Sequence, residues 1–190
     1  MGFLRGGLDG AQNALVLGSP TDPAAVEVCM DLLAHDDPDR LHVLSVLFTA
    51  RPDKRRAEWE HHVGQLPARF DVLCSQQPSA TPDGYDVRQV SGPGNFTGIG
   101  VSITELLSAW PEDAPGSVCL HSATALLQHG TTDQVYQFLY TLCDHLGEAG
   151  VHGHVHLNPG AHDQRTVDTL TTLFDAVVEV DGKETTVKTR

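Results

Sequence analysis

Long hydrophobic runs are missing from this sequence. No stretch approaches the about 20 consecutive apolar residues that a membrane-spanning helix requires, and the opening residues 1–7 (MGFLRGG) are too poor in apolar residues for a secretory signal. We therefore expect no membrane span and a cytoplasmic location. Hydrophobic residues still make up 40% of the 190 residues, which is enough to build the core of one globular domain.

Basic residues are also scarce. Lysine and arginine number 12 against 25 aspartates and glutamates, so the formal net charge is −13, and only 3 of the basic residues are lysines. Such a surface repels phosphate backbones, so nucleic acid is not an expected partner. The one local basic cluster, Arg51 with residues 54–56 (KRR), is interpreted as the solvated start of a helix. Because salt screens the repulsion between hydrated carboxylates, the composition predicts a halophilic protein of a high-salt cytosol.

Closely spaced cysteine pairs are absent. Cys29, Cys74, Cys119 and Cys143 are scattered through apolar or helical stretches without a C-x-x-C motif. This spacing gives no sign of a disulfide framework. Buried, reduced thiols are the expectation.

What the sequence does contain is an alternation of short apolar runs with amphipathic stretches, the pattern of a parallel sheet covered by helices. Strands are predicted at 13–18, 41–49, 70–74, 117–121, 151–157 and 176–180, and helices at 22–34, 53–64, 99–110, 132–149 and 163–174. Asp181-Gly182 is a turn signal that predicts an antiparallel hairpin with a last strand at 184–188.

The segment 75–98 is rich in Pro, Gly, Ser and Asp and predicts a long surface excursion with a short strand-like piece at 85–90. We therefore expect one α/β domain spanning 1–190. It should have three layers: a mostly parallel central sheet, helices on both faces, and a C-terminal antiparallel hairpin.

Several segments, taken in order, resemble the RecA and KaiC-type ATPases. Residues 117–127 (SVCLHSATALL) resemble the second nucleotide-site strand of that family, and residues 173–180 (LFDAVVEV) with 187–190 (VKTR) are similar to the end of a KaiC-type core domain. The short texts at 67–69 (PAR), 98–100 (GIG) and 153–159 (GHVHLNP) are similar to small haloarchaeal KaiC-like proteins of unknown function. The resemblance implies a RecA-like fold over nearly the whole chain.

The residues that hydrolyse ATP in that family have no counterparts here. Its phosphate loop ends in Lys and Ser or Thr, whereas residues 18–23 (GSPTDP) contain no lysine and two prolines without an amide hydrogen. The Asp22 carboxylate would destabilise a bound phosphate by about 4 kcal/mol per charge pair. A helix N-terminus would stabilise it by only about 0.3–1 kcal/mol. His121 stands where the family has its magnesium-associated Asp, and an imidazole does not suit an oxygen-rich magnesium shell. ATP with magnesium is therefore not an expected cofactor.

The resemblance implies one candidate ligand site, which is a vestigial form of the family's nucleotide cleft. Its expected lining residues are Ser19, Thr21, Asp22, His121 and Ser122. The function that follows is a non-catalytic regulatory or signalling module that works by binding, with a protein partner or self-association.

Metal binding is the alternative function. His152, His154 and His156 alternate along a predicted strand and therefore point to one face. Together with His121 at a neighbouring strand end, His154 and His156 form a candidate zinc or nickel site. The competing interpretation is that these imidazoles hydrogen-bond to helix ends and loops, in which case no metal is bound. A Ser-His arrangement of Ser19 or Ser122 with His154 is a weaker alternative, because the G-x-S-x-G elbow of serine hydrolases is missing.

Overall fold

The computed structural model describes all residues except 1–7, 9, 20, 77–84, 183 and 190. Its centre is an eight-stranded sheet in the order β4-β3-β2-β5-β6-β1-β7-β8. The strands are β1 (Asn13–Leu17), β2 (His42–Leu47), β3 (Arg69–Cys74), β4 (Tyr85–Gln89), β5 (Gly116–Leu120), β6 (His152–Leu157), β7 (Ala176–Asp181) and β8 (Glu184–Thr189). All neighbours pair in parallel except β7 and β8, which form the predicted C-terminal antiparallel hairpin.

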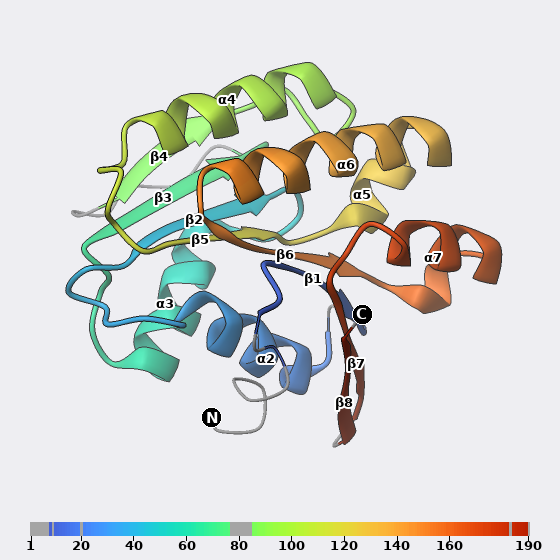
Figure 1. The fold of residues 1–190 in the computed structure, drawn as a ribbon, viewed down its shortest axis with the longest axis horizontal. Helices are drawn as coiled ribbons and strands as arrows, with labels where there is room; N and C mark the ends of the chain where they lie inside the picture. Colours follow the sequence, from blue (N-terminus) through green and yellow to red (C-terminus); the bar gives the residue numbers. More distant parts are fainter. Residues whose placement is uncertain (1–7, 9, 20, 77–84, 183, 190) are drawn as a thin grey trace.

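Helices cover both faces of the sheet, as predicted (Figure 1). On one side lie α2 (Pro23–Leu33) and α3 (Pro52–Val63). On the other side lie α4 (Phe96–Ser108), α5 (Ala123–Leu127), α6 (Thr132–Glu148) and α7 (Gln164–Thr171), with a single 3-10 turn at Pro159–Ala161 before α7. The three-layer α/β architecture is therefore confirmed. No helix within the described residues combines the length and the apolar character needed to cross a membrane.

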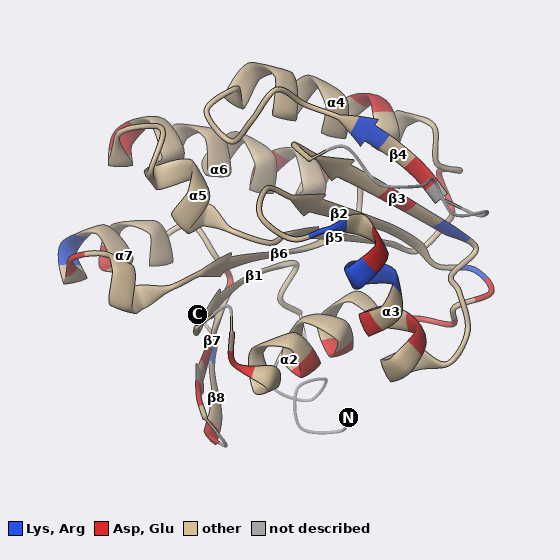
Figure 2. Ribbon diagram, turned by 180° about the vertical axis from the view of Figure 1, so that it is seen from behind, with Lys and Arg blue, Asp and Glu red and all other residues tan. Residues whose placement is uncertain are grey.

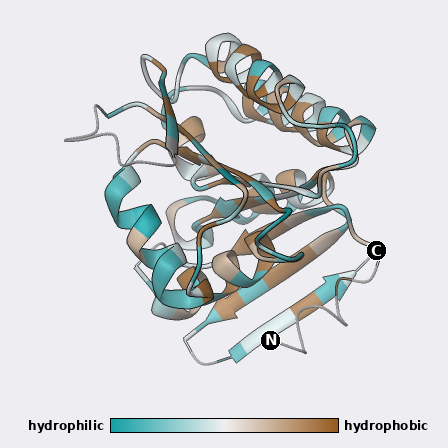
Figure 3. Ribbon diagram, turned by 90° about the vertical axis from the view of Figure 1, so that its left-hand side faces the viewer, coloured by the Kyte–Doolittle hydropathy of each residue, from teal (hydrophilic) through white to brown (hydrophobic). Residues whose placement is uncertain are grey.

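The inner strands are mostly apolar because helices cover both of their faces, although β6 carries three histidines. All five residues of β5 are buried, and Figure 3 shows hydrophobic colouring along the central strands. Side chains alternate between the two layers, so Val118 and Leu120 pack in the core under α4 and α6. Cys119 points the other way, into the core under α2 and α3. This alternation decides which side chains of β5 and β6 can meet.

Local capping chemistry sets several of the helix ends. Asp22 caps α2, because its carboxylate accepts a hydrogen bond from the Ala24 amide at 2.9 Å. A capping box between Thr131 and Gln134 starts α6. Helix α4 begins at Phe96, three residues earlier than predicted, because Asn95 caps it by accepting from the Gly98 amide at 3.0 Å.

The segment 75–98 is only partly a surface excursion. Its strand-like piece forms β4, which pairs in parallel with β3 and makes one edge of the sheet. Its first half, 77–84, lies outside the described residues.

One expectation about the basic cluster is wrong. Arg51 and Lys54 are exposed, as predicted for a solvated helix start, but Arg55 is only 1% exposed. Arg55 and Trp59 stand one helical turn apart on the inner face of α3, and that face packs against the sheet. A buried guanidinium needs partners, and its partners define the candidate site.

Candidate metal centre

Two cysteines and two histidines meet on the sheet face that α2 and α3 cover. Cys29 comes from α2, Cys119 from β5, and His154 and His156 from β6. One ligand atom from each of the four lies within 4.8 Å of the others, and all of the side chains except His156 are buried. Strands β5 and β6 pair so that Cys119 is opposite His154, which brings these two side chains together.

The thiol of Cys29 is at the centre of this cluster. Its Sγ atom lies 3.4 Å from Cys119 Sγ and 3.0 Å from His154 Nε2. The ring of His156 packs edge-on against the ring of His154, with 5.2 Å between the centroids. The Nε2 atom of His156 is buried and has no hydrogen-bond partner among the described residues. Because buried polar atoms are almost always paired, this nitrogen is available for a ligand.

Arg55 holds the two sulfur atoms from the side of α3. Its Nη2 donates to Cys29 Sγ at 2.7 Å and to Cys119 Sγ at 3.3 Å. Its Nε lies 3.4 Å from Ser45 Oγ in β2, and its Nη1 donates to Glu58 at 3.2 Å. The buried positive charge is therefore shared between the cysteine pair and one carboxylate.

This arrangement separates the two thiols in acidity. Burial raises the pKa of Cys29, but the hydrogen bond from Cys119 and the charge of Arg55 outweigh it and hold that pKa well below the ordinary value. Burial and the neighbouring Cys29 raise the pKa of Cys119 well above its ordinary value. Cys29 is therefore the more acidic of the two thiols, and Cys119 is the one that donates to it. Burial lowers the pKa of His154, which keeps the imidazole in the neutral form that binds metals.

The ligand set fits a zinc ion. With bond lengths of about 2.3 Å to sulfur and 2.0 Å to nitrogen, the ligand atoms of a zinc tetrahedron stand about 3.3–3.8 Å apart. Two sulfur ligands stand at the upper end of this range, about 3.8 Å apart. The 3.4 Å between the two sulfur atoms and the 3.0 Å between Cys29 Sγ and His154 Nε2 therefore both require an outward shift of about 0.5 Å. Two thiolates and two imidazoles are a common ligand set for structural zinc.

His121 is near the cluster but outside the four ligands. Its ring stacks on that of His156 with 5.4 Å between centroids. Burial and, more weakly, the charge of Arg55 together lower the pKa of His121 to about 3. Of the three histidines predicted from the sequence, the structure brings His154 and His156 into the cluster and places His121 beside it. His152, which shares their face, is exposed and contacts His35 instead.

The predicted nucleotide cleft is divided in the structure. His121 and Ser122 line a cleft of about 180 Å³ at the carboxyl ends of the strands, together with Gly18 and His156. Ser19, Thr21 and Asp22 do not line it. Ser19 and Thr21 pair through their hydroxyl groups at 2.9 Å, and the Asp22 carboxylate accepts from the amides of Ala24 and Gly182. His156 lines this cleft and also belongs to the cluster.

The serine alternative finds no support among the described contacts. Ser122 caps α5 by accepting from the Ala125 amide, and Ser19 contacts Thr21. The hydrogen-bond contact of His154 is the sulfur of Cys29. Neither serine therefore has a histidine positioned to activate it.

Cys29, Cys119 and Arg55 are the site residues that sequence reasoning missed. The cysteines stand 90 positions apart on a helix and a strand, so no spacing motif connects them. Their burial was predicted, and all four cysteines are free, with Cys143 partly exposed. The available signal was that Cys119 occupies the strand position two residues before His121 and therefore faces the same side of the sheet.

The fold and the site together define a three-layer α/β domain with a buried cysteine-histidine cluster beneath the carboxyl edge of its sheet. The chain belongs to a family of unknown function (DUF7504), whose model matches residues 11–180. A solved structure from Pyrococcus horikoshii OT3, described as a structural study of Project ID PH0250, is similar with a TM-score of 0.58 at 11% identity, over 93% of this chain and 84% of that one. At this identity the similarity concerns the fold alone. No curated protein matches this chain.

Proposed function

We propose that this protein is a non-catalytic binding module whose ligand is a zinc ion held by Cys29, Cys119, His154 and His156. The observation that carries the proposal is the convergence of four soft ligand atoms within 4.8 Å, in the protein interior. The unpaired Nε2 of His156 supports it, because the nitrogen gains a partner when a metal binds.

Charge balance also favours a divalent cation. Two thiolates neutralise a Zn²⁺ ion, and two imidazoles add no charge. The remaining charges, Arg55 and Glu58, already form an ion pair at 3.2 Å. Hydrogen bonds from Arg55 to the sulfur atoms orient the cysteines from outside the ligand set, as outer-shell groups do in metal sites. The buried site is therefore neutral with the metal bound.

Four protein ligands leave no open position for a substrate, so the proposed role of the metal is structural and regulatory. Zinc would tie α2 to β5 and β6, and its gain or loss would change the packing of α2 on the sheet. This role agrees with the resemblance to RecA and KaiC-type proteins without hydrolytic residues, and with a regulatory module of a high-salt cytosol. The use of Asp22 as a helix cap supports the absence of nucleotide hydrolysis.

The direct test is metal content and cobalt substitution of the full-length protein made without a histidine tag. We expect one zinc per chain by elemental analysis. After exchange, we expect the visible absorption of tetrahedral cobalt with thiolate ligands. Protein that carries no stoichiometric metal after expression with added zinc, and no such cobalt spectrum, would contradict the proposal.

Matched variants assign the ligands. Cys119→Ser and His156→Gln should lower the bound metal to well below one equivalent, whereas Cys143→Ser should keep it, because Cys143 lies outside the cluster. His121→Gln should also keep the metal. If His121→Gln removes the metal and Cys119→Ser does not, the set of His121, His154 and His156 predicted from the sequence has to replace the one proposed here.

A further inference from the structure

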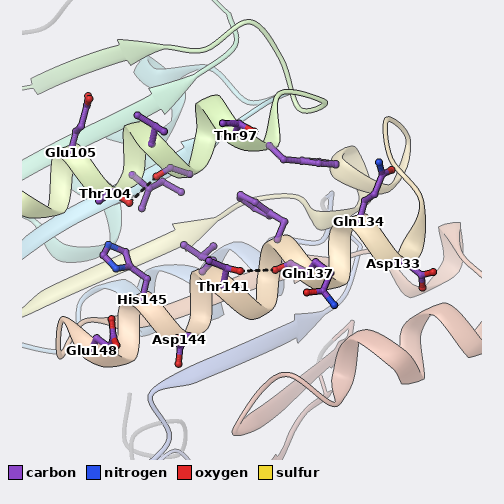
Figure 4. Close-up of a pocket in the computed structure, with 16 residues that line it drawn as sticks. Thr97, Thr104, Glu105, Asp133, Gln134, Gln137, Thr141, Asp144, His145 and Glu148 are labelled. Carbon is purple, nitrogen blue, oxygen red and sulfur yellow. Dashed lines mark hydrogen bonds between the residues drawn. The ribbon is translucent and has the colours of Figure 1, made fainter.

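A long apolar groove lies between α4 and α6, on the sheet face opposite the metal centre (Figure 4). It encloses about 940 Å³. Buried Ile103 and Leu142 are at its base, and partly buried Phe96 and Phe138 stack on each other at 5.6 Å along it. Val101, one of two large hydrophobic side chains that the described surface exposes, lines it and is 52% exposed. Such a surface is a candidate interaction site.

The shape of the groove matches a helix better than a compact small molecule. Its lining residues on α6 extend from Asp133 to Glu148 at helical spacing. At about 1.5 Å per residue this corresponds to about 22 Å, or four helical turns. Gly100 on α4 faces Phe138, and a Cβ atom there would make ordinary van der Waals contact with the Phe138 ring at 3.9 Å. Amphipathic helices bind such grooves through apolar anchors spaced three or four residues apart.

The charges that line the groove indicate the charge of the partner that it would bind. Glu105, Asp133, Asp144 and Glu148 are among its lining residues, and no lysine or arginine is. Glu105 already pairs with Arg88, which leaves three carboxylates on α6 and the imidazole of His145, which points from α6 toward α4 (Figure 4). A second copy of this chain would bring the same acidic groups into contact and is disfavoured.

We propose that the α4–α6 groove binds an amphipathic helix of a partner protein, with an apolar face flanked by lysine or arginine. Apolar side chains of the partner would fill the groove over Ile103 and Phe138. Its basic flanks would face Asp133, Asp144 and Glu148. Electrostatic complementarity of this kind speeds association and rejects acidic partners.

The test uses three fluorescently labelled model peptides with the full-length protein, in KCl at which it is folded. One is an amphipathic Leu/Lys helix, one a scrambled peptide of the same composition, and one the Leu/Glu counterpart of the first. We expect saturable one-to-one binding of the first peptide alone, measured by anisotropy. Equal binding of the scrambled peptide would show unspecific attraction to an acidic protein and would overturn the proposal.

Two matched variants locate the binding. Val101→Asp should weaken the Leu/Lys peptide by about tenfold or more. Tyr140→Asp should leave it unchanged, because Tyr140 is equally exposed, at 56%, but does not line the groove. Circular dichroism confirms that both variants fold. Equal effects of the two variants, or a wild-type dimer in sedimentation that Val101→Asp alone abolishes, would refute a basic helix as the occupant.

Discussion

Arg55 is the residue that contacts both sulfur atoms of the proposed metal site. Its guanidinium contacts both sulfur atoms, Ser45 and Glu58 from a position without solvent access. Burying a charge is costly unless each of its donors finds an acceptor. The sulfur of Cys29 and the carboxylate of Glu58 provide acceptors for it. The arginine is therefore an element of the site, although it cannot bind a metal itself.

We predict that Arg55→Leu lowers the free energy of unfolding of the metal-free protein by about 2–4 kcal/mol, because it removes charge-assisted hydrogen bonds and leaves buried acceptors unpaired. Urea unfolding in the presence of a chelator, followed by the fluorescence of the buried tryptophans, measures the change. Lys54→Leu is the control: Lys54 is an exposed neighbour on α3, and its change should stay within about 0.5 kcal/mol. Equal stability of wild type and Arg55→Leu would show that the guanidinium does not organise the cysteines.

His42 makes stability depend on pH at a place away from the metal centre. Its ring contacts Trp110 edge-on at 5.6 Å, and its Nδ1 is buried without a hydrogen-bond partner among the described residues. Burial and then the charge of Arg69 lower its pKa, while Asp71 opposes this more weakly. The folded protein therefore binds the proton less readily than the unfolded chain does. Stability must fall as the pH drops through the ordinary histidine value of about 6.5.

We predict that His42→Phe flattens the loss of stability between about pH 7 and pH 5. The titration of one histidine changes the free energy of unfolding by at most about 1.4 kcal/mol per pH unit, and a half-buried histidine contributes only part of this change. Urea unfolding at several pH values compares the variant with wild type, and the exposed His61→Phe is the control. If stability depends on pH in the same way in His42→Phe and in wild type, His42 has the same pKa in the folded and unfolded states.

At the scale of single residues, the sequence predicted the histidines better than the cysteines. Alternation along one strand is enough to put His154 and His156 on the same face. The approach of Cys29 depends on how α2 packs on the sheet, which no local pattern encodes. Arg55 was misjudged for the same reason: its charge suggested solvent, whereas the position of α3 on the sheet places it inside.

Among the elements, strand β6 contributes to the packing on both faces of the sheet. It carries His154 and His156 toward α2 and α3, and between its histidines Gly153 faces α6. A Cβ atom at Gly153 would lie 2.5 Å from Leu146 Cδ1 and 2.7 Å from Asn13 Oδ1. The absence of a side chain lets α6 and β1 close over β6.

We predict that Gly153→Ala lowers stability by about 1–3 kcal/mol, because overpacking forces Leu146 and Asn13 to move. Gly147→Ala is the opposite control. There the nearest atom is Gln12 Oε1 at 3.7 Å, and replacing a helical glycine should stabilise α6 by up to about 1 kcal/mol. Thermal unfolding of both variants measures the difference. If Gly153→Ala melts at the wild-type temperature, the contact between β6 and α6 is looser than described.

The helices and strands were largely predictable from the sequence, whereas the open groove between α4 and α6 was not. The strands predicted at 13–18, 70–74 and 176–180 agree with β1, β3 and β7 to within one residue. Helical periodicity also places Phe138 on the apolar face of α6 together with Leu142. Periodicity cannot show that α4 leaves Phe138 beside an open groove, because that depends on the spacing of two helices that are separated by residues 109–131.

For the whole molecule, the acidic charge is spread over the outer layers. Figure 2 shows aspartate and glutamate positions on α2, α3, α4, α7 and the β7–β8 hairpin, with lysine and arginine at only a few places. The ion pairs among the described residues are mostly exposed or half-exposed and contribute little to stability. The net charge of −13 therefore leaves a repulsion that the fold does not neutralise.

We predict that stability rises with KCl into the molar range. The Debye length falls from about 10 Å at 0.1 M to about 3 Å at 1 M salt, so added salt removes the repulsion between separate carboxylates. Urea midpoints at increasing KCl measure the effect.

A triple variant that neutralises the exposed Glu27, Glu112 and Asp113 to their amides should be more stable than wild type at about 0.1 M KCl and gain less from added salt. Equal midpoints at low and high KCl would exclude a halophilic protein, because repulsion at −13 would then have no measurable cost. A wild type and triple variant that gain equally would instead assign the effect to salting-out of apolar surface.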